Sequence, residues 1–466
     1  MSKELIDLFY LIAAVLFIFG LKGLSHPRTA VRGNFFAALG MLIAIVVTLL
    51  DKRIISFEVI IAGIVVGALI GVVMAYKAPM TAIPQVVAIF NGFGGGASAL
   101  AVGAALEEAL KGGFIEAIDM QFTIAAVSSG LIGGVSFTGS AIAFAKLQGL
   151  ITGKPVLLRG RHVINVALIL ICIALSVWLV VDSTSSMPFW IMVGVASLLG
   201  ILLVIPIGGA DMPVVISLLN AYSGIAAAGH GWVLNNSVLI VAGSLVGAAG
   251  FILTAIMCRA MNRSLANVIF AGVGSVVTTE VESDDIYAGR VKSASPEEVA
   301  MMLEGAQRVV IAPGYGMAVS QAQYAIQDLT NLLESMGVEV DFAIHPVAGR
   351  MPGHMNVLLA EANIPYEKLR EMDDINPTFR HTDVVLVVGA NDVVNPMARE
   401  ADQSIPIAGM PILNVDEARS IVIIKRSLSP GFAGIANPLF VADNCLMLFG
   451  DAKKMAMDIT AALKQA

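Results

Sequence analysis

The sequence predicts a polytopic bundle of membrane-spanning α-helices followed by a C-terminal α/β domain with a doubly wound parallel sheet. Of the 466 residues, 57% are hydrophobic and only 14% are charged, whereas soluble domains carry about 25% charged residues. About nine apolar runs in the first 262 residues are each long enough to cross a hydrocarbon core of ~30 Å. From residue 295 onward, short β-branched runs alternate with helical patterns, which is typical of a parallel sheet.

The charges divide the chain into a membrane part and an acidic tail. The first 263 residues contain 14 Lys and Arg against 10 Asp and Glu, and the remaining residues contain 14 against 25. This acidic excess argues against nucleic acid as a partner. We predict a transmembrane domain over 1–262, a hinge or linker over 263–294 and a soluble domain over 295–466.

The Lys and Arg residues of the loops predict the orientation of the membrane part. The nine spans are centred near Ala14, Leu42, Ile64, Ala97, Ile132, Leu170, Val195, Leu219 and Val246. Loops on one side of these spans carry ten Lys and Arg, and those on the other side carry four. Because short basic loops stay in the cytoplasm, we expect the N-terminus outside and the acidic domain in the cytoplasm.

Polar residues inside the spans indicate a passage for a small ion. Asn91, Ser140, Asn220 and Ser223 lie in mid-span, and Asp211 opens the eighth span. Polar groups at membrane depth are costly and usually face a partner or a wet path. The three cysteines lie far apart and paired histidines are absent from the spans, which argues against a metal site and against haem-based electron transfer.

A glycine-rich turn follows the first strand of the C-terminal domain. The strand Val309–Ala312 precedes Gly314-Tyr315-Gly316, and a helical pattern then runs from Met317 to Met336 and ends at Gly337. In a doubly wound sheet, such a turn can bring the N-terminus of a helix to a pyrophosphate. A tight turn without a ligand is the alternative.

Further elements are expected on both sides of this turn. Ser295-Pro296-Glu297-Glu298 predicts a helix start with a capping box. Strands are expected over 338–346, 383–392, 411–418 and 420–427, and helices over 353–364 and 451–466.

Basic residues at one strand end favour NADP(H) over NAD(H). An NAD site normally has a carboxylate at the end of the second strand, but here that strand ends in Ile344-His345-Pro346. The strand over 420–427 ends in Lys425-Arg426-Ser427, which suits a dianionic 2′-phosphate. Arg350, in a glycine-rich loop, is a second candidate phosphate partner. A solvated charge pair at a strand end is the alternative.

The motifs closely resemble those of the β subunit of the proton-translocating NAD(P) transhydrogenase. Matching segments occur in one order along the whole chain and include "GSAIAFAKL", "GGADMPVV", "LNAYSG", "PGYGMAVSQAQY", "HPVAGRMPGHMNVLLAEA", "VVGAND", "IAGMP", "KRS" and "LFGDAK". The resemblance implies a Rossmann-like C-terminal domain and hydride exchange between NADH and NADP⁺, coupled to inward proton movement. It also implies a location in the inner (cytoplasmic) membrane.

The resemblance implies a site for each part of this activity. The NADP(H) site would comprise Gly314, Tyr315, Gly316, Val347, Ala348, Gly349, Arg350, Met351, Pro352, Gly389, Ala390, Asn391, Asp392, Val393, Gly409, Met410, Lys425, Arg426, Ser427, Leu428, Ser429, Pro430, Gly431, Phe432, Asp451 and Ala452. Among these, Asp392 would lie near the nicotinamide end and is the one residue with an expected catalytic, electrostatic role. The proton path and its coupling would use Asn91, Ser140, Asp211, Asn220 and Arg263.

Two positions depart from the family pattern. Some members have a histidine where this chain has Asn91, and an asparagine cannot take up a proton near neutral pH. The proton carrier is therefore expected on a separate membrane subunit. Several members have a tyrosine where this chain has Phe432, so a hydroxyl role in the lid over NADP(H) does not carry over.

A partner must supply the second nucleotide. Hydride transfer needs two nicotinamides whose reacting atoms approach to ~3 to 3.5 Å, and this chain has one nucleotide turn in the proper context. We expect one or more α subunits that carry an NAD(H) domain and additional membrane helices, with the whole complex a dimer in the lipid bilayer. The alternative function is a nucleotide-gated channel or carrier with a non-catalytic NADP-sensing domain.

Overall fold

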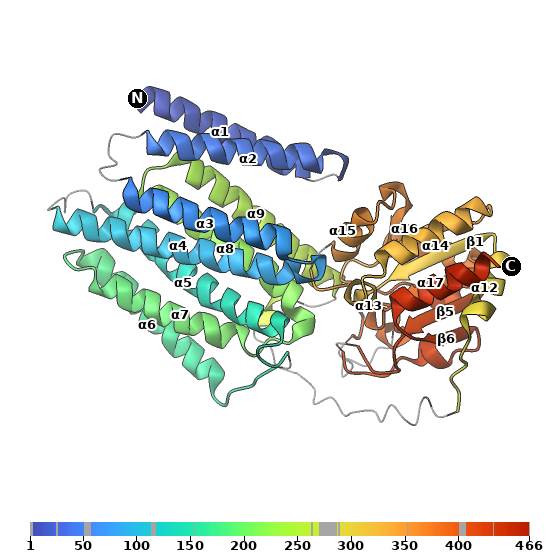
Figure 1. The fold of residues 1–466 in the computed structure, drawn as a ribbon. Helices are drawn as coiled ribbons and strands as arrows, with labels where there is room; N and C mark the ends of the chain where they lie inside the picture. The colour runs from blue at the N-terminus through green and yellow to red at the C-terminus, as the bar shows by residue number, and fades with distance from the viewer. Residues whose placement is uncertain are drawn as a thin grey trace. The chain divides into compact units, whose positions relative to one another are not determined.

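The structure is a computed structural model in which two compact units are distinguished, 1–208 with 214–254 and 209–213 with 255–466 (Figure 1). The residues that the structure describes are 3–24, 27–50, 57–112, 118–153, 155–261, 264–269, 287, 289–351, 353–399, 407–431 and 433–465.

The first unit is built from long apolar helices. Among the described residues, nine helices are long and apolar enough to cross a membrane, and each contains one of the predicted span centres. They are α1 (Lys3–Leu24), α2 (Pro27–Leu49), α3 (Glu58–Lys77), α4 (Ile83–Lys111), α5 (Met120–Gln148), α6 (Arg161–Val181), α7 (Met187–Val204), α8 (Met212–Val233) and α9 (Ser237–Ala260). The predicted polytopic bundle is confirmed.

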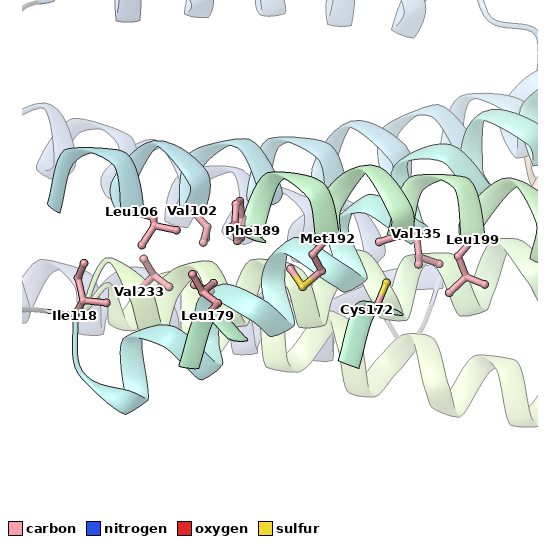
Figure 2. Close-up of a cluster of buried hydrophobic side chains, with 12 residues drawn as sticks. Val102, Leu106, Ile118, Val135, Cys172, Leu179, Phe189, Met192, Leu199 and Val233 are labelled. Carbon is pink, nitrogen blue, oxygen red and sulfur yellow. The ribbon is translucent and has the colours of Figure 1, made fainter. Parts of the chain in front are cut away.

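Small residues bring the central helices together. A Cβ added to Gly133 of α5 would lie 2.5 Å from the Gly95 carbonyl oxygen of α4, so only glycine permits this backbone approach. On its other flank, α5 packs against α7, and Phe189 and Met192 of α7 are fully buried there (Figure 2). Cys172 and Leu179 of α6 complete this apolar cluster.

The second unit contains the predicted parallel sheet. Its described strands are β1 (Arg308–Pro313), β2 (Glu339–Ile344), β3 (Leu369–Glu371), β4 (Val384–Val388), β5 (Ser420–Lys425) and β6 (Cys445–Phe449). They pair in parallel in the order β3-β2-β1-β4-β5-β6, with Val310 opposite Asp341 on one side and Val385 on the other. The inner strands are almost wholly buried, as expected for a parallel sheet. This is the Rossmann-like fold that the sequence predicts.

The second unit also contains seven α-helices among its described residues. They are α10 (Leu265–Ile269), α12 (Pro296–Glu304), α13 (Tyr315–Val319), α14 (Gln323–Ser335), α15 (His354–Glu361), α16 (Met372–Ile375) and α17 (Ala452–Leu463). Helix α17 packs against both α12 and α14. The predicted capping box at the start of α12 is present, because Glu298 N donates to Ser295 Oγ and Ser295 N donates to Glu298 Oε2.

Two sequence-based element predictions are wrong. The helix expected over 317–336 is broken between α13 and α14, because Ser320 Oγ donates to the Gly316 carbonyl and Gln321 adopts a φ of 50°. The segment 411–418 is not a strand, since Leu413 N donates to Val393 O outside the sheet and Val415–Glu417 form a 3₁₀ turn. The strands that the sequence did not indicate are β3 and β6.

Part of the predicted hinge lies on the sheet. Ser293 forms a parallel bridge with Met447 of β6, and Met447 N donates to the Lys292 carbonyl over 2.8 Å. Residues 270–286 of the hinge lie outside the described part of the chain.

Candidate dinucleotide site and membrane polar seam

The strand order places the candidate site at the carboxyl edge of the sheet. The chain leaves β1 toward β2 on one side and returns to β4 on the other, so the order reverses between β1 and β4. In open α/β sheets, the crevice at such a reversal binds the ligand. The predicted loops follow the carboxyl ends of β1, β2, β4, β5 and β6 and therefore share this edge.

The glycines after β1 and β4 allow two loops to touch. Gly314 N donates to Val388 O, and Gly316 N donates to Gly389 O, both over 2.9 Å. A Cβ on Gly314 would lie 2.4 Å from Ala390 Cα, and Gly389 has a φ of 66°. These glycines thus serve the contact between the loops, and the N–H groups of Gly314 and Gly316 are used within the protein.

Arg350 lies over an aromatic ring beside the glycine turn. Its Cζ is 4.3 Å from the centroid of the Tyr315 ring, which is a cation–π geometry. Burial raises the pKa of Tyr315, while the Arg350 charge opposes this shift. The loop after β2 and the turn after β1 are thereby brought together.

Two buried histidines hold the loop that carries Arg350. Val347 N donates to His345 Nδ1 over 3.2 Å, and Arg350 N donates to His354 Nδ1 over 3.0 Å. His345 Nε2 lies 2.7 Å from Pro411 O, so it carries the proton and donates. Burial lowers the pKa of both imidazoles to about 4, and Arg350 adds to the shift at His354. Both rings are therefore neutral acceptors at neutral pH.

The Asp392 side chain contacts the loop that follows β5. Ala433 N donates to Asp392 Oδ2 over 3.0 Å. A Cβ added to Gly431 would lie 2.4 Å from Asp392 Oδ1, so a larger residue at 431 would collide with the carboxylate. With its side-chain oxygen turned toward the same loop, Asn391 accepts from Gly431 N and Lys425 Nζ over 2.7 and 3.1 Å.

The three polar residues at the end of β5 do not point the same way. Lys425 Nζ donates to Ser429 O over 2.8 Å and lies 4.8 Å from the centroid of the Phe440 ring. Burial lowers the pKa of Lys425 to about 8, although Asp392 opposes the shift. Arg426 and Ser427 are exposed, and the Ser427 hydroxyl pairs with that of Ser429.

The remaining predicted residues lie near the same edge or support it. Asp451 caps α17 by accepting from Lys453 N and Lys454 N, and Ala452 begins that helix. Met410 is buried in a small core with Ile412, against which Val347 packs. Gly409 has a φ of 70°. Two further predicted residues, Ala348 and Val393, are buried. Met351, Leu428 and Pro430 occupy half-buried or exposed loop positions. Gly349 has a φ of 111°. Pro352 and Phe432 lie outside the described residues.

A seam of polar groups links α4, α5 and α8 in the membrane unit. Asn91 Nδ2 donates to Ile216 O over 3.3 Å, and Ser136 Oγ lies 3.2 Å from Leu219 O. Ser140 is fully buried one turn further along α5, and its hydroxyl has no hydrogen-bond partner within the described part of the chain. A Cβ added to Gly92 would lie 3.1 Å from Ser140 Cβ, so α4 and α5 meet here.

The other predicted coupling residues are placed separately. Asn220 is half-buried on α8. Asp211 is buried at the end of the 3₁₀ turn Gly209–Asp211, directly before α8. Arg263 lies outside the described residues. Ser136, His345 and His354 were not predicted, although the glycine-rich segment around the two histidines was.

No cluster of metal-ligating side chains occurs among the described residues, and the three cysteines are free and buried.

Comparison with known proteins agrees with this architecture. Residues 6–462 match the family model described as NAD(P) transhydrogenase beta subunit. The chain is 49% identical over 466 residues to the NAD(P) transhydrogenase subunit beta of Rhodospirillum rubrum, covering 99% of this chain and 100% of that protein. The protein of Rhodospirillum rubrum strain ATCC 11170 gives the same values. The chain belongs to the NAD(P) transhydrogenase beta subunit family.

Proposed function

We propose that the sheet domain binds NADP(H) and that, with a partner holding NAD(H), the chain couples hydride exchange to proton translocation across the membrane. The observation that carries the proposal is the junction at the carboxyl edge of the sheet. There Lys425, the cation at the end of β5, and Asp392, the carboxylate after β4, both bond to the loop that follows β5. Lys425 donates to Ser429 O, and Asp392 accepts from Ala433 N.

The donor set at this edge fits a phosphorylated dinucleotide. Lys425, Arg426 and Ser427 offer two cations and a hydroxyl for a dianionic 2′-phosphate; because Lys425 bonds to Ser429 O while Arg426 and Ser427 are exposed, binding would have to turn Lys425 toward the phosphate. Arg350, which lies over the Tyr315 ring, would be a second hydrogen-bond donor to a phosphate. Gly314 and Gly389 let the loops after β1 and β4 pack directly against each other at this edge of the sheet. When bound, NADP(H) would supply or accept the hydride, while Asp392 would act electrostatically at the nicotinamide end.

The polar seam of the membrane unit would provide the proton path. Asn91, Ser140 and Asn220 offer amide and hydroxyl groups, and we place the titrating carrier on a partner subunit. Coupling would be a linkage in which protonation in the bundle changes the affinity of the NADP(H) site. We assign Asp211 and Arg263 to this relay on the cytoplasmic side.

The proposed assembly follows from the missing second nucleotide. The partner would be one or more α subunits with the NAD(H) domain and further membrane helices, and the complex would be a dimer in the inner membrane. The domain limits proposed are 1–262, 263–294 and 295–466, with the sheet domain in the cytoplasm.

A binding experiment tests the cofactor. The purified full-length chain, titrated calorimetrically, is expected to bind NADP⁺ at least about tenfold more tightly than NAD⁺. The reason is that a hydrogen-bonded ion pair between the 2′-phosphate and the Lys425 amine is worth about 1.5 kcal/mol or more. Lys425→Met should remove most of this preference, whereas Lys453→Met, at an exposed lysine of α17, should leave it unchanged. Equal affinities of the wild-type chain for the two nucleotides would refute the assignment.

A reconstitution experiment tests the coupled reaction. In vesicles that contain this chain and its partner subunits, reduction of an NAD analogue by NADPH should be accompanied by a pH change in the lumen. The purified chain alone should bind NADP(H) without turnover. Robust turnover by the chain alone would contradict the need for a partner. Proton flux gated by NADP(H) without hydride transfer would instead support the nucleotide-gated channel.

A further inference from the structure

Tyr287 is the first described residue after 270–286, and its side chain is buried in the sheet unit. It is 7% exposed, and its hydroxyl accepts a hydrogen bond from Asn437 N over 2.7 Å. Its ring stacks on that of Phe440, with centroids 6.0 Å apart and an interplanar angle of 23°. Burial raises the pKa of Tyr287, so the hydroxyl stays protonated near neutral pH.

Both partners of Tyr287 lead directly to the candidate dinucleotide site. Phe440 is fully buried, and Lys425 Nζ lies 4.8 Å from the centroid of its ring. Asn437 Nδ2 donates to the main-chain oxygen of Asn391 over 3.2 Å. One tyrosine therefore supports, through one residue each, the cation after β5 and the loop after β4.

We propose that Tyr287 is a positioning residue of the NADP(H) pocket, which holds Phe440 against Lys425 and Asn437 against the loop that carries Asp392. Loss of the contacts of Tyr287 would let Phe440 and Asn437 move, and these would displace Lys425 relative to that loop. This inference rests on the proposed function, because it names a residue that keeps the proposed pocket in its binding geometry.

The fold does not depend on this contact alone. Asn395, which is fully buried, donates from Nδ2 to Ala436 O over 3.1 Å and accepts from Met397 N. These hydrogen bonds of Asn395 hold Ala436, the residue before Asn437, independently of Tyr287. Removing the hydroxyl of Tyr287 should therefore loosen the pocket while the sheet stays folded.

The test measures nucleotide release from the intact complex. Tyr287→Phe keeps the stacked ring but removes the acceptor of Asn437 N, whereas Tyr287→Leu removes both contacts. NADPH release, followed by its fluorescence after a chase with excess NADP⁺, should be about three- to tenfold faster in Tyr287→Phe, since one buried hydrogen bond is lost. It should be faster still in Tyr287→Leu. The affinity of the complex for NAD(H) should not change.

Controls separate a positioning role from general destabilisation. Tyr324→Phe removes a hydroxyl from an exposed tyrosine of the same unit and should match the wild type. Tyr287→Phe leaves the buried Asn437 N without its acceptor, so its melting temperature without nucleotide should fall slightly, but NADPH release should rise by more than this loss of stability accounts for. If the wild type binds NADPH and both Tyr287 variants release it at the wild-type rate, the inference is overturned. It is equally overturned if release rises only in proportion to a lower melting temperature. If the wild-type complex does not bind NADPH, the proposed function itself is refuted.

Discussion

The half-buried cation at the end of β5, Lys425, predicts a pH dependence of NADP⁺ binding that can be worked out from its environment. Burial lowers the pKa of Lys425 from 10.5 to about 8, while the nearby Asp392 opposes the shift. Only the protonated amine attracts the 2′-phosphate. A single group with a pKa near 8 is about 90% protonated at pH 7 and about 10% protonated at pH 9.

The affinity should therefore fall by about tenfold between pH 7 and pH 9. Above pH 8, binding should also take up close to one proton, because the phosphate favours the charged lysine. Calorimetry in buffers of different ionisation enthalpy measures both quantities. The same shift acts on stability: the charged lysine disfavours the folded state below about pH 8, and this penalty disappears as the pH rises from 8 to 10.5.

Lys425→Arg provides the matched variant, because the guanidinium stays charged over the whole range. Its affinity profile should be flat from pH 7 to pH 9. Lys453→Met, at the exposed lysine of α17, should keep the wild-type profile. A wild-type affinity that does not change between pH 7 and pH 9 would refute the reasoning, since it would show that Lys425 either does not face the phosphate or is not desolvated.

Three further substitutions follow from the geometry. Gly314→Ala should lower the melting temperature and abolish NADP⁺ binding, because its Cβ would lie 2.4 Å from the backbone of Ala390. Gly305→Ala, where the nearest atom is 3.9 Å away, should do neither. A Gly314→Ala variant with normal stability and binding would contradict the close contact of the loops. His354→Phe removes the acceptor of a loop N–H and should weaken NADP⁺ binding about fivefold by calorimetry, whereas unchanged affinity would exclude a role in holding the loop. Asp211→Asn should alter proton pumping or NADP(H) affinity in vesicles, and if it changes neither, its coupling role is lost.

The individual strands could be predicted only where the sequence pattern is strong. β1, β4 and β5 are runs rich in Val and Ile, as is typical of buried parallel strands, and β2 is apolar between Val340 and Ile344 except for Asp341. β3 has three residues, too few to show a period, and β6 contains Met447 and Cys445, which have no strong strand preference. The segment 411–418 has strand-like residues, but its backbone bonds to the loop after β4. Tertiary contacts decided its conformation.

The candidate site was predictable as a set of loops but not in its internal contacts. Lys425, Arg426 and Ser427 form one basic motif in the sequence, yet neighbouring residues at a strand end point in different directions. Only Lys425 turns inward, to Ser429 O and the Phe440 ring. His345 gave no signal because its partner, Pro411 O, is remote in the sequence and is a main-chain atom.

The same limit applies to the serines of the membrane helices. A serine in a helix most often donates to the carbonyl one turn earlier, as Ser98 does to Gly94 O and Ser128 to Ile124 O. Ser129 and Ser136 of α5 instead donate across to Ala226 O and Leu219 O of α8. Composition cannot distinguish these cases, because the outcome depends on how closely a glycine lets the next helix approach. A hydroxyl that bonds across helices resists their separation. We therefore expect that any motion that separates α5 from α8 must break these two hydrogen bonds, whereas the hydrogen bonds within α5 can persist.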